Sequence, residues 1–78
     1  MREDEVKVKV ELLQKKASIF FNENKKVHLT FSNRKYWRRG FIVEIYGDRF
    51  IIHDEVTNIR EIIFFLDLWD IRECLEER

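Results

Sequence analysis

The hydrophobic positions at the start of the chain recur with the period of a helix. The apolar side chains that stand three or four residues apart are Val6, Val10, Leu13, Ala17 and Phe20. They share one stripe of a helix, and Asn22 and Asn24 are typical helix-stop residues. The alternation over residues 6–10 also fits a strand. Because the stripe continues beyond this alternation, we predict a helix over about residues 3–22.

From Lys25 onward the period changes to two, which is the period of a strand. The pattern predicts five strands, over residues 27–32, 36–46, 50–54, 61–66 and 70–75, with a single helical turn at 67–69. Gly40 interrupts the second strand, where a glycine usually marks a sharp bend or a close approach of two backbones. Gly47 lies in the turn at 46–49 and is free to take a positive φ. One helix followed by five short antiparallel strands predicts a mainly β fold, a small barrel with the helix over one open end.

Length and composition limit the chain to one domain. It has 78 residues, of which 45% are hydrophobic, enough for one small core. We therefore predict a single domain over residues 1–78, with the helix at about 3–22 and the barrel at about 25–75. Its one cysteine excludes an internal disulfide. No apolar run approaches the roughly 18 residues of a membrane span, and the start MREDE is not a secretory signal, so we expect a soluble, cytoplasmic protein without a membrane partner.

The zero net charge conceals an uneven distribution along the chain. Residues 25–49 hold seven basic and two acidic side chains, whereas residues 50–78 hold three basic and eight acidic ones. The basic part could meet a polyanion, or two copies could associate head to tail. The alternative is a solvated surface rich in ion pairs.

A basic and aromatic stretch is the main candidate for a binding site. Residues 34–39 interleave cations, which can follow phosphates, with flat rings on which bases can stack. Strand alternation would place Lys35, Trp37 and Arg39 on one face. The candidate RNA-binding residues are Lys35, Tyr36, Trp37, Arg38 and Arg39, with Tyr46 and Arg49 as a second group beside the predicted hairpin. Alternatively, one aromatic ring of the first group, or Tyr46, covers the core.

Other kinds of site are poorly supported. His28 and His53 fall on different predicted strands without cysteines or carboxylates at ligand spacing, which argues against a metal. Cys74 has no base within sequence reach and is expected in the core or an interface. Gly40 and Gly47 are isolated and form no phosphate-binding loop. We therefore expect no cofactor and no catalytic activity.

Residues 27–55 carry a family resemblance. They read VHLTFSNRKYWRRGFIVEIYGDRFIIHDE, with Gly40, an apolar Ile42 two residues later, and a hairpin into an apolar third strand. With the preceding helix and the later Ile63-Phe64-Phe65, this resembles the Sm-like family, which includes bacterial Hfq and small archaeal proteins. The resemblance implies an N-terminal helix followed by a five-stranded antiparallel SH3-like barrel.

The resemblance also implies partners. Family members that bind uridine-rich RNA carry an Asn in the loop before strand three and an Arg-Gly before strand five. Residues 46–50 contain no Asn and residues 66–70 no Arg-Gly, so a standard uridine pocket is not supported. Family members form rings of six or seven subunits by pairing strand four with the next subunit's strand five. The interface residues expected on this basis are Ile63, Phe65, Trp69 and Ile71.

Two functional hypotheses follow. The first is an oligomeric module that contacts single-stranded RNA by phosphate neutralisation and base stacking, without catalysis. The second is a self-assembling protein-interaction module of the same fold that binds no nucleic acid.

Overall fold

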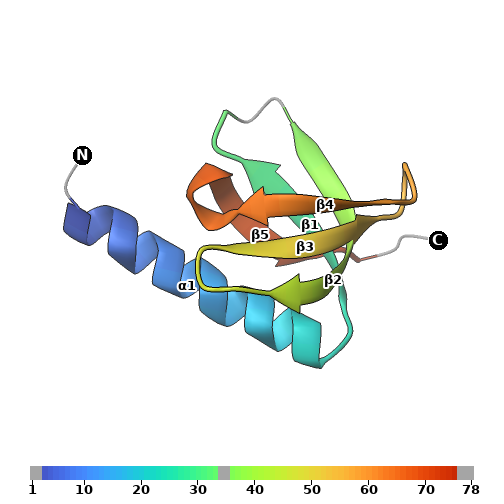
Figure 1. The fold of residues 1–78 in the computed structure, drawn as a ribbon, viewed down its shortest axis with the longest axis horizontal. Helices are drawn as coiled ribbons and strands as arrows, with labels where there is room; N and C mark the ends of the chain where they lie inside the picture. The colour runs from blue at the N-terminus through green and yellow to red at the C-terminus, as the bar shows by residue number, and fades with distance from the viewer. Residues whose placement is uncertain (1–2, 34–35, 76–78) are drawn as a thin grey trace.

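The computed structural model describes residues 3–33 and 36–75, with side chains from residue 5 onward. Its elements follow in the order α1 (Glu3–Asn22), β1 (Lys26–Phe31), β2 (Trp37–Ile45), β3 (Arg49–Asp54), β4 (Ile59–Phe64), the 3-10 turn η1 (Phe65–Asp67) and β5 (Leu68–Glu73) (Figure 1). The predicted helix and five strands are thus confirmed. No helix in this part of the chain has the length and hydropathy that a membrane span needs.

Helix α1 packs its predicted stripe against the sheet. Leu13 and Ala17 are buried in the core, and Val10 and Phe20 pack against it. Beyond the helix, Asn24 takes a φ of 54°, a left-handed conformation that Asn tolerates well. The amide of Lys25 then donates to the carbonyl of Phe20 over 2.9 Å and closes the helix end. The sequence signals for both the face and the end of α1 are therefore confirmed.

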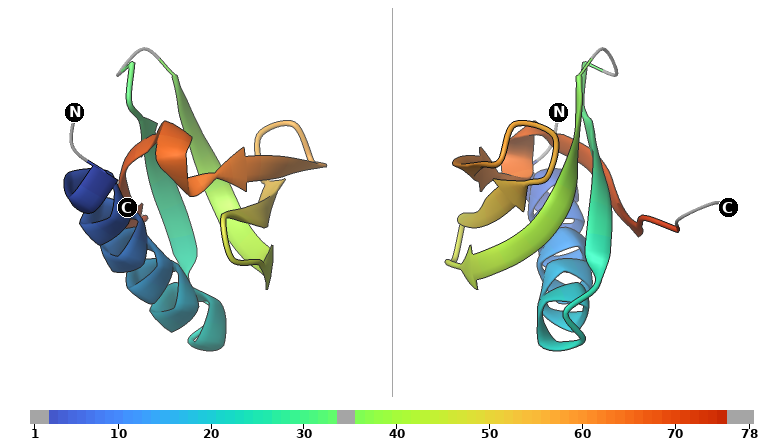
Figure 2. Two further views of the ribbon diagram at one scale, coloured as in Figure 1. Left: turned by 60° about the vertical axis from the view of Figure 1, so that its left-hand side comes forward. Right: turned by 90° about the vertical axis from the view of Figure 1, so that its right-hand side faces the viewer.

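The five strands form one antiparallel sheet in the order β4-β3-β2-β1-β5. The sheet is strongly bent, and α1 lies across one of its open ends (Figures 1 and 2). Strands β4 and β5 are consecutive in the chain but lie at opposite edges of the sheet, joined only by η1. Within the described residues, each of these two strands therefore has one edge that pairs with no other strand.

The two glycines do not have the same role. A Cβ at Gly40 would overlap the carbonyl of His53 on β3, which confirms the predicted close approach of two backbones. The bend continues in an irregular pairing of β2 with β3 between Ile42 and Glu44. The prediction for Gly47 was wrong, because no glycine in the described residues has a positive φ.

The last two strands begin two residues earlier than predicted. Phe65 is fully buried and its ring centroid lies 5.2 Å from that of Phe50, so the chain turns at η1 to place this ring in the core. Trp69 consequently belongs to β5 and not to a connection. Burial also corrects the expected interface, because the side chains of Ile63, Phe65 and Ile71 lie in the chain's own core. They are unavailable to a neighbouring subunit, whereas Trp69 is exposed.

Candidate nucleic-acid interface

The start of β2 exposes two aromatic rings. Tyr36 is 60% exposed and Trp37 49%, so neither ring fills the core. The residues that line a pocket of about 300 Å³ beside them are Tyr36, Trp37, Arg38, Asp54, Val56 and Thr57. Flat rings at a shallow pocket are suited to stacking with a planar ligand such as a nucleobase.

Arg38 forms a wall of this pocket and is held by two carboxylates. Its Nε lies 2.9 Å from Oε1 of Glu61 and 3.5 Å from Oδ2 of Asp54. Asp54 is buried, and its Oδ1 accepts hydrogen bonds from the amides of Val56 (2.7 Å) and Thr57 (3.2 Å). The charge of Arg38 is thus compensated within the chain, so this residue shapes the pocket and is not a free cation for phosphate.

Trp37 is half exposed, and two basic side chains lie near its ring. His28 lies opposite Arg39 on β2 and opposite Arg72 on β5. The ring of Trp37 lies 5.7 Å from that of His28, and the guanidinium of Arg39 lies 5.7 Å from the Trp37 centroid. Trp37 and Arg39 thus lie together as predicted, whereas Lys35 lies outside the described residues. We call His28, Trp37, Arg39 and Arg72 the Trp37 face.

Acidic residues from later in the chain reduce the charge of this region. The carboxylate of Glu55 lies 2.9 Å from Nε of Arg39 and 2.8 Å from Nζ of Lys26. The contact with Arg39 is ionic only, since Nε of Arg39 makes no hydrogen bond to any described residue. Arg72 forms no ion pair with any residue that the structure describes. The face therefore keeps a modest positive excess, and much of the basic segment pairs with the acidic one inside the same chain.

The surroundings of His28 lower its pKa. Partial burial, and then the neighbouring cations Arg72 and Arg39, lower the pKa of His28 below its usual 6.5. At neutral pH the imidazole is therefore uncharged and can stack beside Trp37.

We expect the stability of the protein to depend on pH through His28. As the pH falls through 6.5, the unfolded chain gains a proton that folded His28 does not bind. The stabilising contribution is thus present above 6.5 and is lost as the pH falls towards the lower folded pKa. Between about pH 7.5 and about pH 5.5, urea unfolding should show the wild type losing more stability than His28→Gln. Equal losses in the two proteins would contradict the assignment.

The second predicted group lies at the other end of β2. Tyr46 is exposed and its hydroxyl donates to Glu44, which raises the pKa of Tyr46 above its usual 10.0. Arg49 lies 3.2 Å from the carboxylate of Asp48 and 5.4 Å from the ring centroid of Phe64. Both side chains are engaged locally, and the structure does not bring them together with the Trp37 face.

The turn that carries this second group lies beside the helix. The side-chain amide of Gln14 on α1 donates to the carbonyl of Gly47, and the amide of Phe65 donates to the carbonyl of Asp48 over 3.0 Å. The loops before β3 and before β5 are thus neighbours. They lack the Asn and the Arg-Gly that the family resemblance associates with binding of uridine-rich RNA.

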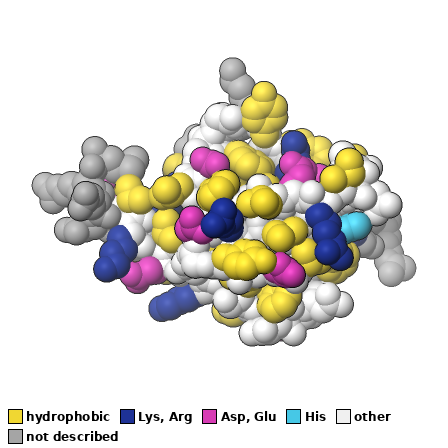
Figure 3. All heavy atoms as spheres, viewed as in Figure 1, with side chains coloured by type: hydrophobic (Ala, Val, Ile, Leu, Met, Phe, Trp, Pro, Cys, Tyr) yellow, Lys and Arg dark blue, Asp and Glu magenta, His cyan; other side chains and the backbone are white. Residues whose placement is uncertain are grey.

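The remaining candidates of the sequence form no site of their own. His53 is partly buried, with Nε2 2.7 Å from Oδ1 of Asn58, and Cys74 is partly buried. The described residues contain no group of three His, Cys, Asp or Glu that could hold a metal ion. On the face that carries β3 and β4, apolar side chains are spread among single basic and acidic groups (Figure 3).

Sequence reasoning missed two members of the Trp37 face. His28 was weighed as a metal ligand or a partly exposed barrel residue, and Arg72 entered only the charge count, so neither was a candidate for RNA binding. No local motif marks them, because they meet only through the register of β1 with β2 and β5. A correct alignment of these three strands would have been the signal.

Comparison with known proteins identifies the fold of the chain. No protein-family model matches the chain, and no curated protein matches it. Among solved structures, it is similar to a crystal structure of Hfq, described there as a pleiotropic translational regulator. The TM-score is 0.66 at 15% sequence identity, over 77% of this chain and 95% of that one. The fold is therefore Sm-like, of the Hfq type.

Proposed function

We propose that this Sm-like domain is a non-catalytic module that binds single-stranded RNA through the Trp37 face and the adjoining pocket. The observation that carries the proposal is the exposed ring of Trp37, which lies close to both His28 and Arg39 and next to the exposed Tyr36. Similarity to Hfq, a translational regulator by its description, supports the proposal at the level of fold.

The chemistry of the site predicts how such binding would behave. Stacking on Trp37 and Tyr36 is tolerant of base identity, because every base presents a flat face. With Arg39 paired to Glu55, about one net positive charge per chain is available, from Arg39 and Arg72. At a slope of about −0.7 per phosphate contact, raising the salt from about 50 to about 200 mM should weaken binding about threefold per engaged chain.

Fluorescence anisotropy of labelled single-stranded RNA, uridine-rich and mixed, tests the proposal. Trp37→Ala should weaken binding about tenfold, because stacking contributes about 1–3 kcal/mol per base. Tyr46→Ala is the matched control. It removes an aromatic side chain that is 49% exposed, like Trp37, but at the other end of β2. We expect its affinity to equal that of the wild type.

Two results would overturn the assignment. If no binding is seen at micromolar protein concentration in low salt, the proposed RNA binding is wrong. Loss of affinity in Tyr46→Ala but not in Trp37→Ala would move the site to the turn between β2 and β3.

A second function, self-association, is favoured by a separate observation. Strands β4 and β5 each have an edge without a partner strand in the described structure, so a second copy can pair with either. Head-to-tail pairing of β4 with β5 would produce the ring of six or seven subunits that the family resemblance implies. Light scattering coupled to gel filtration tests this, since one chain has a mass of 9.7 kDa.

A further inference from the structure

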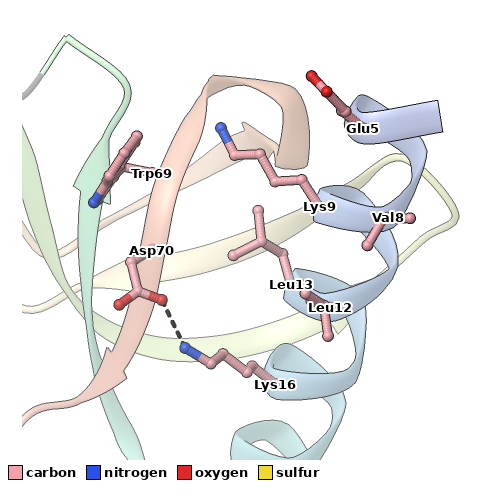
Figure 4. Close-up of a pocket in the computed structure, with 8 residues that line it drawn as sticks. All are labelled: Glu5, Val8, Lys9, Leu12, Leu13, Lys16, Trp69 and Asp70. Atoms are coloured by element: carbon pink, nitrogen blue, oxygen red, sulfur yellow. Dashed lines mark hydrogen bonds and ion pairs between the residues drawn. The ribbon is translucent and has the colours of Figure 1, made fainter. Parts of the chain in front are cut away.

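A groove runs between α1 and the free edge strand β5. The residues that line it are Glu5, Val8, Lys9, Leu12, Leu13, Lys16, Trp69 and Asp70, and its volume is about 570 Å³ (Figure 4). Its surface is largely apolar, and Val8, Leu12 and Trp69 are all exposed. Burying these side chains would be favourable.

Charged side chains also line the groove. At one end, Nζ of Lys16 lies 2.7 Å from Oδ1 of Asp70, an ion pair that joins α1 to β5 (Figure 4). Lys9 extends from α1 towards β5, and its Nζ lies 5.8 Å from the ring centroid of Trp69. Lys9 forms no ion pair within the described residues. An occupant with an apolar side chain next to a carboxylate would therefore match the groove in both respects.

The opposite edge of the sheet carries a segment of this kind. Strand β4 exposes Ile62 and Phe64, and η1 exposes Leu66. The next residue, Asp67, is also exposed and has no ion pair with any residue that the structure describes. Leu66 and Asp67 thus place an apolar side chain next to an uncompensated carboxylate, beside the unpaired edge of β4.

We infer that the groove between α1 and β5 receives Leu66 of a second copy of this chain, with Asp67 of that copy near Lys9. The inference rests on the self-association proposed above and identifies the surface that performs it. One head-to-tail contact would cover both exposed apolar regions and place a carboxylate beside an unpaired ammonium. A groove-to-groove contact would bring two copies of Lys9 together and leave Ile62, Phe64 and Leu66 in water.

Single substitutions test each side of the contact. Leu12→Glu in the groove and Leu66→Glu on η1 should each raise the dissociation constant between chains at least about tenfold, because each buries a carboxylate among apolar groups. Ile19→Glu is the matched control on the same helix, since Ile19 is 53% exposed and Leu12 57%, but Ile19 does not line the groove. Circular dichroism should show all three variants folded.

Mixing the two interface variants tests the head-to-tail geometry. Leu12→Glu retains an intact Leu66 and Leu66→Glu retains an intact groove, so an equimolar mixture can form one native contact. We expect light scattering to give a one-chain mass for each variant alone and a two-chain mass for the mixture.

The outcomes separate the inference from the self-association on which it rests. A wild type that remains a 9.7 kDa monomer at high concentration would overturn both. An oligomeric wild type whose mass is unchanged by Leu12→Glu would overturn the groove assignment and leave self-association standing. A mixture without a two-chain species would exclude the head-to-tail contact.

Discussion

Phe65→Ala is expected to remove most of the stability of this domain. Phe65 is fully buried, packs against Phe50 and ends the run of strand β4. Replacing a buried Phe by Ala costs about 3–5 kcal/mol, from lost burial and the remaining cavity. Total stabilities of single domains are only about 5–15 kcal/mol. Urea unfolding at low protein concentration should therefore show a large fall in midpoint.

Phe64→Ala is the matched control for this prediction. The neighbouring ring is 40% exposed and contacts the guanidinium of Arg49, with 5.4 Å to the ring centroid. Its removal should cost less than about 1 kcal/mol at a protein concentration too low for association. Equal destabilisation by the two substitutions would contradict the placement of Phe65 in the core. A greater effect of Phe64→Ala on oligomer mass would support an interface at the exposed face of β4.

Phe64 and Phe65 show why the sequence did not indicate which side chains at the end of β4 face the core. Residues 62–66 form a continuous apolar run, so alternation cannot indicate which side chains face the core. The face is decided by packing, since α1 and β3 together cover Phe65. A shift of one residue in a strand moves every side chain to the opposite face. The expected interface therefore named Ile63, Phe65 and Ile71, which are core residues.

Other features were predictable because their signals are local. The stripe from Val10 to Phe20 identifies both the helix and its buried face, and Asn24 ends it with a positive φ. The basic and aromatic stretch at residues 34–39 was also identified from the sequence, but whether its rings are exposed was left open, and the structure exposes both Tyr36 and Trp37. The ion pairs of Arg38 and Arg39 were not predicted, because their carboxylate partners lie in the later acidic segment.

The two proposed functions use different side chains, although both involve β5, which carries Arg72 of the Trp37 face. The RNA site is assigned to the Trp37 face and the pocket at the start of β2, whereas association is assigned to the edges β4 and β5 and the α1 groove. Trp37→Ala should therefore leave the oligomer mass unchanged. Leu12→Glu should leave intact the RNA contact of a single chain, although avidity from several linked chains would be lost.

Gly40→Ala is expected to destabilise the barrel, although it adds only one methyl group. The new Cβ would overlap the carbonyl oxygen of His53 and lie 3.1 Å from Cα of Asp54, both backbone atoms of β3. Strand β3 would have to move, and overpacking of this kind costs about 1–3 kcal/mol. Gly40 pairs directly with Asp54, whose carboxylate holds Arg38 in the pocket wall. Displacement of β3 should thus also weaken RNA binding.

Gly47→Ala should have the opposite effect on stability. No atom lies within 4 Å of the position of its Cβ, and its φ is not positive, so alanine fits without strain. Restricting the unfolded chain should then stabilise the domain by about 0.4–1 kcal/mol, or at least leave it unchanged. Thermal unfolding of both variants measures the contrast. Destabilisation by Gly47→Ala equal to that by Gly40→Ala would mean that the cost comes from losing glycine in general, and that the close approach of β2 to β3 is not what Gly40 provides.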